Sequence, residues 1–251
     1  MEVGLITVGD EVLSGDIVNT NASWLASELT ESGVNVTRVL TLPDERGVIA
    51  SKVKAYSDAV DGVIVTGGIG GTPDDVTMEA VADAFGTTLE PTELTLSSVR
   101  SHVASFEKRA PDLDIDVDEE AEAAIPTGSR PLLNEEGLVP GCVIENVYVL
   151  PGIPNEMQAM YEQIADEFNG RIQSTFLYTV EPESNIVEAL EGAMDRYDVS
   201  VGCYPDHDAG HNRLKVTAHD VEEINRAATW LIAEVPASRE PISRHEKPDQ
   251  D

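Results

Sequence analysis

The hydrophobic and polar positions change period repeatedly over the first 170 residues. Short, almost continuous apolar runs are typical of parallel strands buried on both faces, and such runs occupy residues 3–8, 34–42 and 62–66. Stretches with apolar positions three or four apart predict helices, here over residues 19–32, 46–59 and 77–85. This alternation predicts an α/β domain in which a mostly parallel sheet has helices on both faces.

The pattern is less regular further along the chain and then restarts. Residues 91–125 are predicted to be mainly helical, 143–150 to form one late strand and 155–168 another helix. A new β-α-β-β-α order follows. The sequence therefore predicts a first domain over 1–170, a small α+β domain over 171–236, and a polar tail over 237–251 that we expect to be frayed.

The composition is strongly acidic. The sequence holds 47 Asp and Glu residues against 16 Lys and Arg, a formal net charge of −31 at pH 7. Such a surface repels nucleic-acid backbones and anionic membranes, so neither is expected as a partner. Self-repulsion weakens with salt, because the Debye length falls from about 30 Å at 0.01 M to about 3 Å at 1 M. We therefore expect a protein of a high-salt cytoplasm, such as that of a haloarchaeon.

Neither a membrane segment nor a disulfide framework is expected. No apolar run approaches the roughly 18 residues of a membrane span, and Met1 and Glu2 lead into the first strand without a basic leader. The 2 cysteines are too few for a disulfide scaffold or a zinc cluster. The sequence predicts a soluble cytoplasmic protein.

Four polar or glycine-rich segments come directly after predicted strands. They are Gly9, Asp10 and Glu11 with Gly15; Pro43 and Asp44; the run from Gly67 to Asp75; and the run from Pro151 to Pro154. The carboxyl ends of parallel strands meet at one edge of a sheet, where open α/β folds bind ligands. We therefore expect these segments to form one site.

The third segment has the strongest ligand-binding pattern. Its glycines allow backbone amides to approach a phosphate, and the helix that follows presents unpaired N–H groups. Asp74 and Asp75 are suited to a hard divalent cation, although a glycine turn with Asp as a helix cap fits the same residues. The glycine spacing matches neither a P-loop nor a dinucleotide fingerprint.

A second acidic cluster, from Asp206 to His211, holds two Asp and two His within six residues. Side chains of this kind bind metals. Because the cluster falls between two predicted strands, a simple acidic hairpin loop is the favoured interpretation.

Five motifs in fixed order carry a family resemblance. They are G-D-E-V-L-S-G, L-P-D, V-T-G-G-I-G-G-T-P-D-D-V-T-M-E-A, P-L-L-N-E-E-G-L-V-P-G and P-G-I-P-N-E-M, all between residues 3 and 168. The chain resembles the MoaB/Mog-like molybdopterin-binding domain, and most of all the amino-terminal part of the competence/damage-inducible protein A (CinA) family. The small segment after residue 170 is similar to the subdomain that follows in CinA-type proteins.

The resemblance implies a divalent-metal-dependent pyrophosphatase that acts on ADP-ribose or related dinucleotides. Asp44 and Asp75 would be catalytic, and Mg²⁺, Mn²⁺ or Co²⁺ would be held by Asp74, Asp75 and Glu11. The residues expected to contact the ligand or its phosphates are Gly9, Asp10, Glu11, Gly15, Gly67, Gly68, Gly70, Gly71, Thr72, Asn134, Pro151, Gly152 and Pro154.

Two other functions remain open on the same motifs. One is the binding or adenylylation of molybdopterin in molybdenum-cofactor synthesis, and the other is a non-catalytic module that binds a nucleotide or a pterin phosphate. The resemblance also implies a homo-oligomer. The nicotinamide-nucleotide amidase domain of two-part CinA proteins lies beyond the last residue here, so no deamidase activity is expected.

Overall fold

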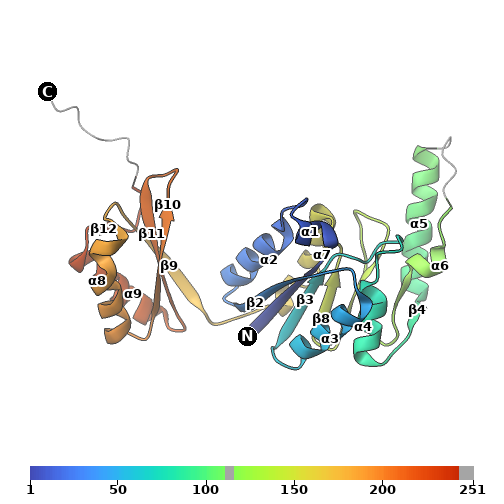
Figure 1. The fold of residues 1–251 in the computed structure, drawn as a ribbon, viewed down its shortest axis with the longest axis horizontal. Helices are drawn as coiled ribbons and strands as arrows, with labels where there is room; N and C mark the ends of the chain where they lie inside the picture. Colours follow the sequence, from blue (N-terminus) through green and yellow to red (C-terminus); the bar gives the residue numbers. More distant parts are fainter. Residues whose placement is uncertain (111–115, 243–251) are drawn as a thin grey trace. The chain divides into compact units, whose positions relative to one another are not determined.

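The computed structural model describes residues 1–110 and 116–242. The chain separates into two compact units, Met1–Gly170 and Arg171–Asp251, and each is described by itself (Figure 1). In the part of the chain that is described, no helix combines the length and the apolar character needed to cross a membrane.

The first unit is built on a six-stranded sheet of order β2-β1-β3-β8-β7-β6. Strands β2, β1, β3 and β8 run parallel to one another, whereas β7 pairs antiparallel with β8, and β6 antiparallel with β7, at one side of the sheet. The strands are β1 (Glu2–Val8), β2 (Asn35–Leu42), β3 (Gly62–Thr66), β6 (Arg130–Leu132), β7 (Gly141–Ile144) and β8 (Val147–Leu150). The predicted α/β class and its mostly parallel sheet are confirmed.

Helices cover both faces of this sheet, as predicted. Neighbouring positions of β3 illustrate the division: Ile64 packs in one core with residues of α2 and α7, whereas Val63 and Val65 pack in the other with residues of α3 and α4. The helices of the unit are α1 (Asp10–Ser14), α2 (Thr20–Glu31), α3 (Arg46–Ser57), α4 (Thr77–Phe85), α5 (Glu93–Arg109), α6 (Glu119–Glu122) and α7 (Pro154–Glu162).

Two helical predictions were too long. The helix predicted over 155–168 ends at Glu162, and a separate 3₁₀ turn, Ala165–Glu167, follows it. The region 91–125 also contains strand pairing, because β4 (Leu89–Pro91) and β5 (Ala124–Pro126) form a small antiparallel sheet beside α5 and α6. Residues 111–115 of this region lie outside the described residues.

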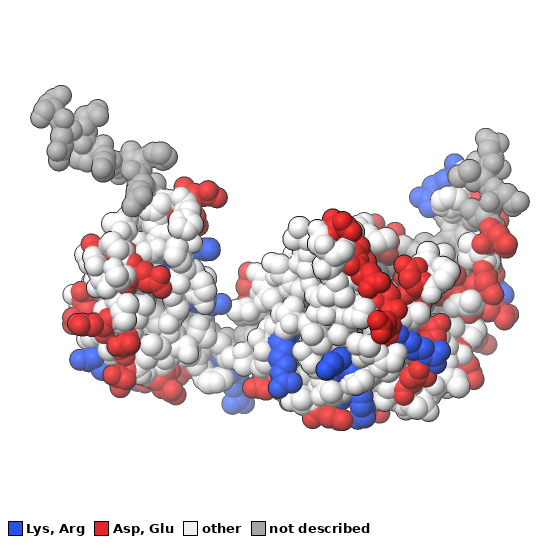
Figure 2. All heavy atoms as spheres, viewed as in Figure 1, with Lys and Arg blue, Asp and Glu red and all other residues white. Residues whose placement is uncertain are grey.

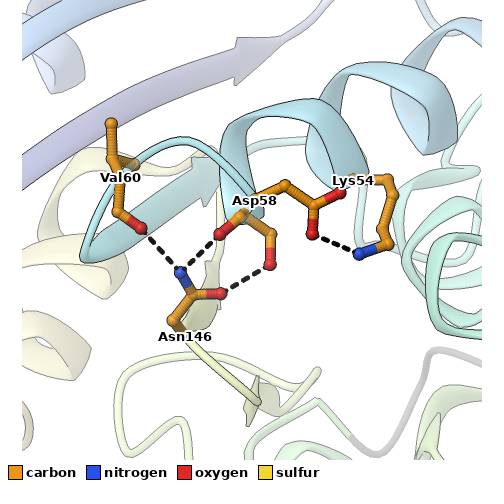
Figure 3. Close-up of polar contacts among 5 residues, drawn as sticks. Lys54, Asp58, Val60 and Asn146 are labelled. Atoms are coloured by element: carbon orange, nitrogen blue, oxygen red, sulfur yellow. Dashed lines mark hydrogen bonds and ion pairs between the residues drawn. The ribbon is translucent and has the colours of Figure 1, made fainter.

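The single strand predicted over 143–150 is wrong, because the segment is the hairpin β7–β8. Its turn is made by Glu145, with a φ of 50°, and Asn146. The Asn146 amide donates to the carbonyl oxygens of Ser57 and Val60, both at 3.0 Å, and accepts from Ser57 Oγ at 2.6 Å (Figure 3). The turn is thus held by contacts with the end of α3, which the local apolar pattern does not encode.

The second unit is a four-stranded antiparallel sheet of order β10-β11-β9-β12, with α8 and α9 packed on it. Its elements are β9 (Gln173–Thr179), α8 (Glu183–Arg196), β10 (Ser200–Asp206), β11 (His211–Ala218), α9 (Val221–Glu234) and β12 (Ala237–Ser238). The predicted tail therefore begins too early: Ala237 and Ser238 pair with Thr179 and Tyr178, because the edge of β9 is open there. Residues 243–251 of the predicted tail lie outside the described residues.

Most of the face shown in Figure 2 is uncharged; acidic side chains form the larger charged patches on both units, and a group of basic side chains lies low on the first unit. The described ion pairs, such as Arg46–Asp83 and Arg130–Glu167, join partly exposed side chains. Exposed pairs of this kind contribute about 0–1 kcal/mol each. The stability of the first unit therefore rests on its two apolar cores and on partly buried hydrogen bonds such as those of Asn146.

Replacing Asn146 with Ala should destabilise the protein by about 2 kcal/mol, because three partly buried hydrogen bonds that hold the turn are lost. Urea unfolding in high salt would measure the loss. The matched control is Asp58→Ala, which removes the neighbouring exposed Lys54–Asp58 ion pair (Figure 3). It should cost less than 1 kcal/mol. Equal losses in the two variants would show that the Asn146 contacts do not hold the turn.

Candidate functional site

A cavity of about 630 Å³ opens at the carboxyl edge of the parallel strands. It lies where the chain order reverses: β2 and β3 flank β1, and the helices that follow β1 and β2 pack on opposite faces of the sheet. Such reversals leave a crevice between the strand ends. All four segments singled out in the sequence reach this cavity, through Gly9, Glu11, Asp44, Gly67, Gly68, Gly70, Asp74, Asp75, Pro151, Gly152 and Pro154.

Close backbone packing explains two of the glycines. Gly67 has a φ of 95°, and a Cβ atom there would lie 2.3 Å from the carbonyl oxygen of Val8. Gly68 has a φ of 66°, and a Cβ atom would lie 2.5 Å from Thr77 Oγ1. Only glycine adopts these conformations without strain. The β1 and β3 loops can therefore meet closely enough to form the floor of the cavity.

Thr72 organises the two aspartates of the glycine-rich loop. Its Oγ1 lies 2.6 Å from Asp74 Oδ1 and 2.6 Å from Asp75 Oδ2, and its backbone N–H donates to Asp75 Oδ2 at 3.0 Å. The hydrogen bond from Thr72 lowers the pKa of Asp74. Thr72 does not itself line the cavity, but it holds the two carboxylates that do.

Asp44 sits at the end of β2 beside the β1 loop. Its Oδ2 accepts a hydrogen bond from the backbone N–H of Asp10 at 2.8 Å. Burial raises the pKa of Asp44; the Asp10 N–H opposes this, and the charges of Asp10, Glu11 and Asp74 add to it. The charged form of the Asp44 carboxylate is therefore disfavoured by its surroundings, and carboxylates with a perturbed pKa are characteristic of functional sites.

Five predicted ligand residues do not line the cavity: Asp10, Gly15, Gly71, Thr72 and Asn134. Asp10 and Thr72 hold other site residues, as described above. Gly15 ends α1 in a left-handed conformation, and Gly71 packs against Glu122, whose pKa is raised by burial and by the charges of Asp75 and Asp118. The side chain of Asn134 is buried behind the cavity wall.

Sequence reasoning missed a polar wall on the other side of the cavity. Asn19 caps α2 and bonds Thr7, with 3.0 Å between Asn19 Nδ2 and Thr7 Oγ1. Asn21 Nδ2 donates to the carbonyl oxygen of Gly152 at 2.7 Å. Asn19 was recognisable as a helix cap, but the contact of Asn21 joins residues far apart in the sequence. Glu156 and the apolar Ile17, Val18, Leu138, Val139 and Ile153 complete the wall.

No Lys, Arg or His among the described residues lines the cavity. The predicted metal ligands Glu11, Asp74 and Asp75 all do, but within 1–110 and 116–242 no three His, Cys, Asp or Glu side chains form a metal-binding group. The carboxylates still suit Mg²⁺, which is usually held by one or two carboxylates together with water and phosphate oxygens. The metal therefore stays a prediction.

The Asp206–His211 cluster lies in the second unit. Strands β10 and β11 extend to Asp206 and His211, which pair across the ladder, so the turn is shorter than predicted. Asp206 accepts from the backbone N–H of Ala209, and the ring of His211 contacts Tyr178 and the carbonyl oxygen of Ile242. These contacts are those of a structural hairpin.

Comparison with known families agrees with the two-unit structure. A family model described as "Probable molybdopterin binding domain" matches residues 4–169. The chain belongs to this family. A second family model, described as "FAD synthase, middle domain", matches residues 171–240 of the same chain.

Individual relatives extend the match to nearly the whole chain. A protein of Archaeoglobus fulgidus is 36% identical over 232 residues, which are 90% of this chain and 95% of that protein. A CinA-like protein of Citrifermentans bemidjiense is 35% identical over 243 residues, or 92% of this chain and 57% of that protein. The crystal structure of CinA, a protein of unknown function from Thermoplasma acidophilum, is 30% identical with a TM-score of 0.58, covering 67% of this chain and 99% of that one. This member of the family is CinA-like.

Replacing Asp44 with Asn should stabilise the fold at pH 7. Because the folded protein raises the pKa of Asp44 above its ordinary value of about 3.9, its ionisation costs stability as pH rises through the shifted pKa. Thermal melts between pH 3 and pH 8 should give the Asp44→Asn variant a higher melting temperature than the parent at neutral pH. Below about pH 3.9 the two melting temperatures should be equal.

Asp74→Asn is the matched control with the opposite sign. The pKa of Asp74 is lowered, so ionised Asp74 stabilises the fold above its ordinary pKa, and this contribution is lost as pH falls. This variant should melt slightly below the parent at pH 7. Two variants that shift the melting temperature in the same direction at pH 7 would contradict the assigned electrostatics.

Proposed function

We propose that this CinA-like protein hydrolyses the diphosphate bond of ADP-ribose or a related dinucleotide with the help of a divalent cation. The observation that carries the proposal is the gathering of Glu11, Asp44, Asp74 and Asp75 around a glycine-lined cavity without a basic side chain among the described residues. Carboxylates alone would repel a diphosphate. A site of this composition is suited to phosphate when a cation lies between them.

The backbone supplies the second part of phosphate binding. Gly68 and Gly70 bring the loop after β3 to the cavity with no side chain in the way, and this loop leads into α4. No side chain caps the first turn of α4. The N–H of Thr77 donates to the carbonyl oxygen of Gly68 at 2.9 Å, so the later N–H groups of the first turn and the helix dipole are what favour an anion at this end. We assign the diphosphate to this side of the cavity.

Glu11, Asp74 and Asp75 would hold the cation together with phosphate oxygens. When bound there, it would neutralise the diphosphate and make a nearby water molecule more acidic. Thr72 fixes Asp74 and Asp75 in advance, through the contacts of 2.6 Å to both carboxylates. This preorganisation reduces the entropy that binding would otherwise cost.

Asp44 is suited to accept the proton of the attacking water. Its raised pKa makes it a better base than an ordinary aspartate, and the Asp10 N–H holds its Oδ2 in place. The water oxygen forms a bond to one phosphorus, the bridging oxygen leaves with the other phosphate, and the proton passes to Asp44. ADP-ribose and water thus give AMP and ribose 5-phosphate.

The match of the second unit to a domain named for FAD synthase supports this substrate class. FAD, like ADP-ribose, joins adenosine through a diphosphate to a second group. The two compounds therefore share an adenosine group on a diphosphate, and this is the proposed substrate class.

Molybdopterin binding or adenylylation is the second candidate, and the family description of residues 4–169 favours it. Asp44 and Asp75 would serve that reaction equally, because it also involves attack at a phosphorus beside adenosine. A module that binds nucleotide or pterin without turnover is the third. Hydrolysis of ADP-ribose would distinguish the first candidate from the third, and tight binding of molybdopterin would distinguish the second candidate from the first.

Asp75→Asn should reduce ADP-ribose hydrolysis at least 100-fold while the melting temperature changes little, because a cation-binding carboxylate is lost from an exposed loop. Release of AMP would be followed by chromatography in about 2–3 M KCl, which screens the surface charge. Mg²⁺, Mn²⁺ and Co²⁺ would be supplied one at a time.

The control is Asp83→Asn, which removes an exposed carboxylate of α4 that pairs with Arg46 away from the cavity. It should keep full turnover. Unchanged hydrolysis in Asp75→Asn would remove Asp75 from the site, and no hydrolysis by the parent protein with any of the metals would reject the pyrophosphatase proposal.

A further inference from the structure

Glu156 places a carboxylate in the wall of the cavity on the side of α7. It lies in the first turn of that helix, directly after the Pro151–Pro154 segment, and is partly buried. Its Oε2 accepts a hydrogen bond from Asn134 Nδ2 at 2.7 Å. No described protein group donates to its Oε1. One oxygen is therefore fixed, and the other is left as an acceptor without a protein partner.

Asn134 is a fully used anchor for this carboxylate. Its Oδ1 accepts from the backbone N–H groups of Glu136 and Gly137, at 3.2 and 2.9 Å. Its Nδ2 donates to Glu156 and to the carbonyl oxygen of Val139, at 2.7 and 3.2 Å. An amide side chain has two donor hydrogens and two acceptor sites, so Asn134 has none left for a ligand. It acts on the cavity through Glu156 and through the loop that carries Leu138 and Val139.

Glu156 and Asp44 lie at opposite ends of the cavity. Asp44 follows β2 and Glu156 follows β8, and the sheet order places β1 and β3 between them. Three strand intervals of about 4.8 Å place the ends of β2 and β8, from which the two segments leave the sheet, about 14 Å apart. A nucleoside diphosphate whose phosphates lie beside Asp44 and Gly68 therefore extends its neutral part toward Glu156.

The chemistry of this end differs from that of the phosphate end. An ionised carboxylate only accepts hydrogen bonds and repels a phosphate. Leu138 and Val139, on the loop that Asn134 holds, and Ile153, just before α7, add an apolar wall at this end, which suits a ring. An acceptor beside an apolar wall fits the hydroxyl or N–H donors of a nucleoside.

We propose that Glu156, held in place by Asn134, is the residue that selects the nucleoside half of the ligand by accepting a hydrogen bond from its ribose or its base. This inference rests on the proposed nucleotide function and adds the group that the far end of the cavity recognises.

The test uses AMP, which contains the nucleoside but no diphosphate bond to hydrolyse. Titration calorimetry of the full chain in high salt with Mg²⁺ would compare the parent protein with Glu156→Gln. A glutamine can still accept from Asn134, but it then presents an amide donor where the carboxylate presented an acceptor. We expect the Kd for AMP to rise about tenfold, the size of one charge-assisted hydrogen bond.

Three analogues locate the contact: 2′-deoxy-AMP, 3′-deoxy-AMP and IMP, which lacks the amino group of adenine. The parent protein should discriminate against at least one of them, and Glu156→Gln should lose that discrimination. Glu162→Gln, at the exposed end of α7, is the matched control and should bind as the parent does. Melting curves of all variants would show that the fold is kept.

The outcomes separate the two proposals. Equal AMP affinity and equal discrimination in the parent and Glu156→Gln would overturn the role of Glu156, whether or not ADP-ribose is hydrolysed. AMP binding that depends on Glu156 without any ADP-ribose hydrolysis would support this inference and reject the pyrophosphatase. A parent protein that binds none of the four nucleotides would overturn this inference, and the hydrolysis of ADP-ribose would then decide the pyrophosphatase proposal by itself.

Discussion

Carboxylates held close together around the cavity of the first unit repel one another, and this repulsion lowers the free energy of unfolding. Glu11, Asp44, Asp74 and Asp75 share one cavity, and no basic side chain among the described residues lines it. The raised pKa of Asp44 expresses the cost directly, since its neighbours and its burial both disfavour the charged form. An arrangement that weakens the free protein persists when it serves a ligand. Here the missing partner would be a cation together with a phosphate.

The fold holds these groups in place by means that leave the cavity open. The β1 and β3 loops meet through Gly67 and Gly68, where a side chain would collide with the neighbouring loop or with α4. The two apolar cores fix the helices on both faces of the sheet, and the strand order then sets the spacing between the segments that carry Asp44 and Glu156. Stability comes from the cores and from polar anchors such as the partly buried Asn146 and the buried Asn134, and not from the exposed ion pairs.

Local sequence patterns predicted the parallel strands and the main helices, because period and turn residues are local properties. They also placed the four loop segments at one sheet edge, since parallel strand ends must meet there. The β7–β8 hairpin was missed because the contact of Asn146 with the end of α3 decides it. The pairing of Ala237 with Thr179 and the wall around Glu156 were missed for the same reason. Such contacts join residues far apart in the sequence, and a single sequence carries no local sign of them.

The most direct test of this account is the binding of ADP-ribose to the parent protein by titration calorimetry, with and without Mg²⁺ at constant KCl. If carboxylates and backbone amides alone form the phosphate end, the diphosphate needs a cation. The account predicts measurable binding with Mg²⁺ and its loss, by tenfold or more, when EDTA replaces the metal. Equal affinity in EDTA would contradict the central claim, because the protein would then hold the diphosphate without a cation.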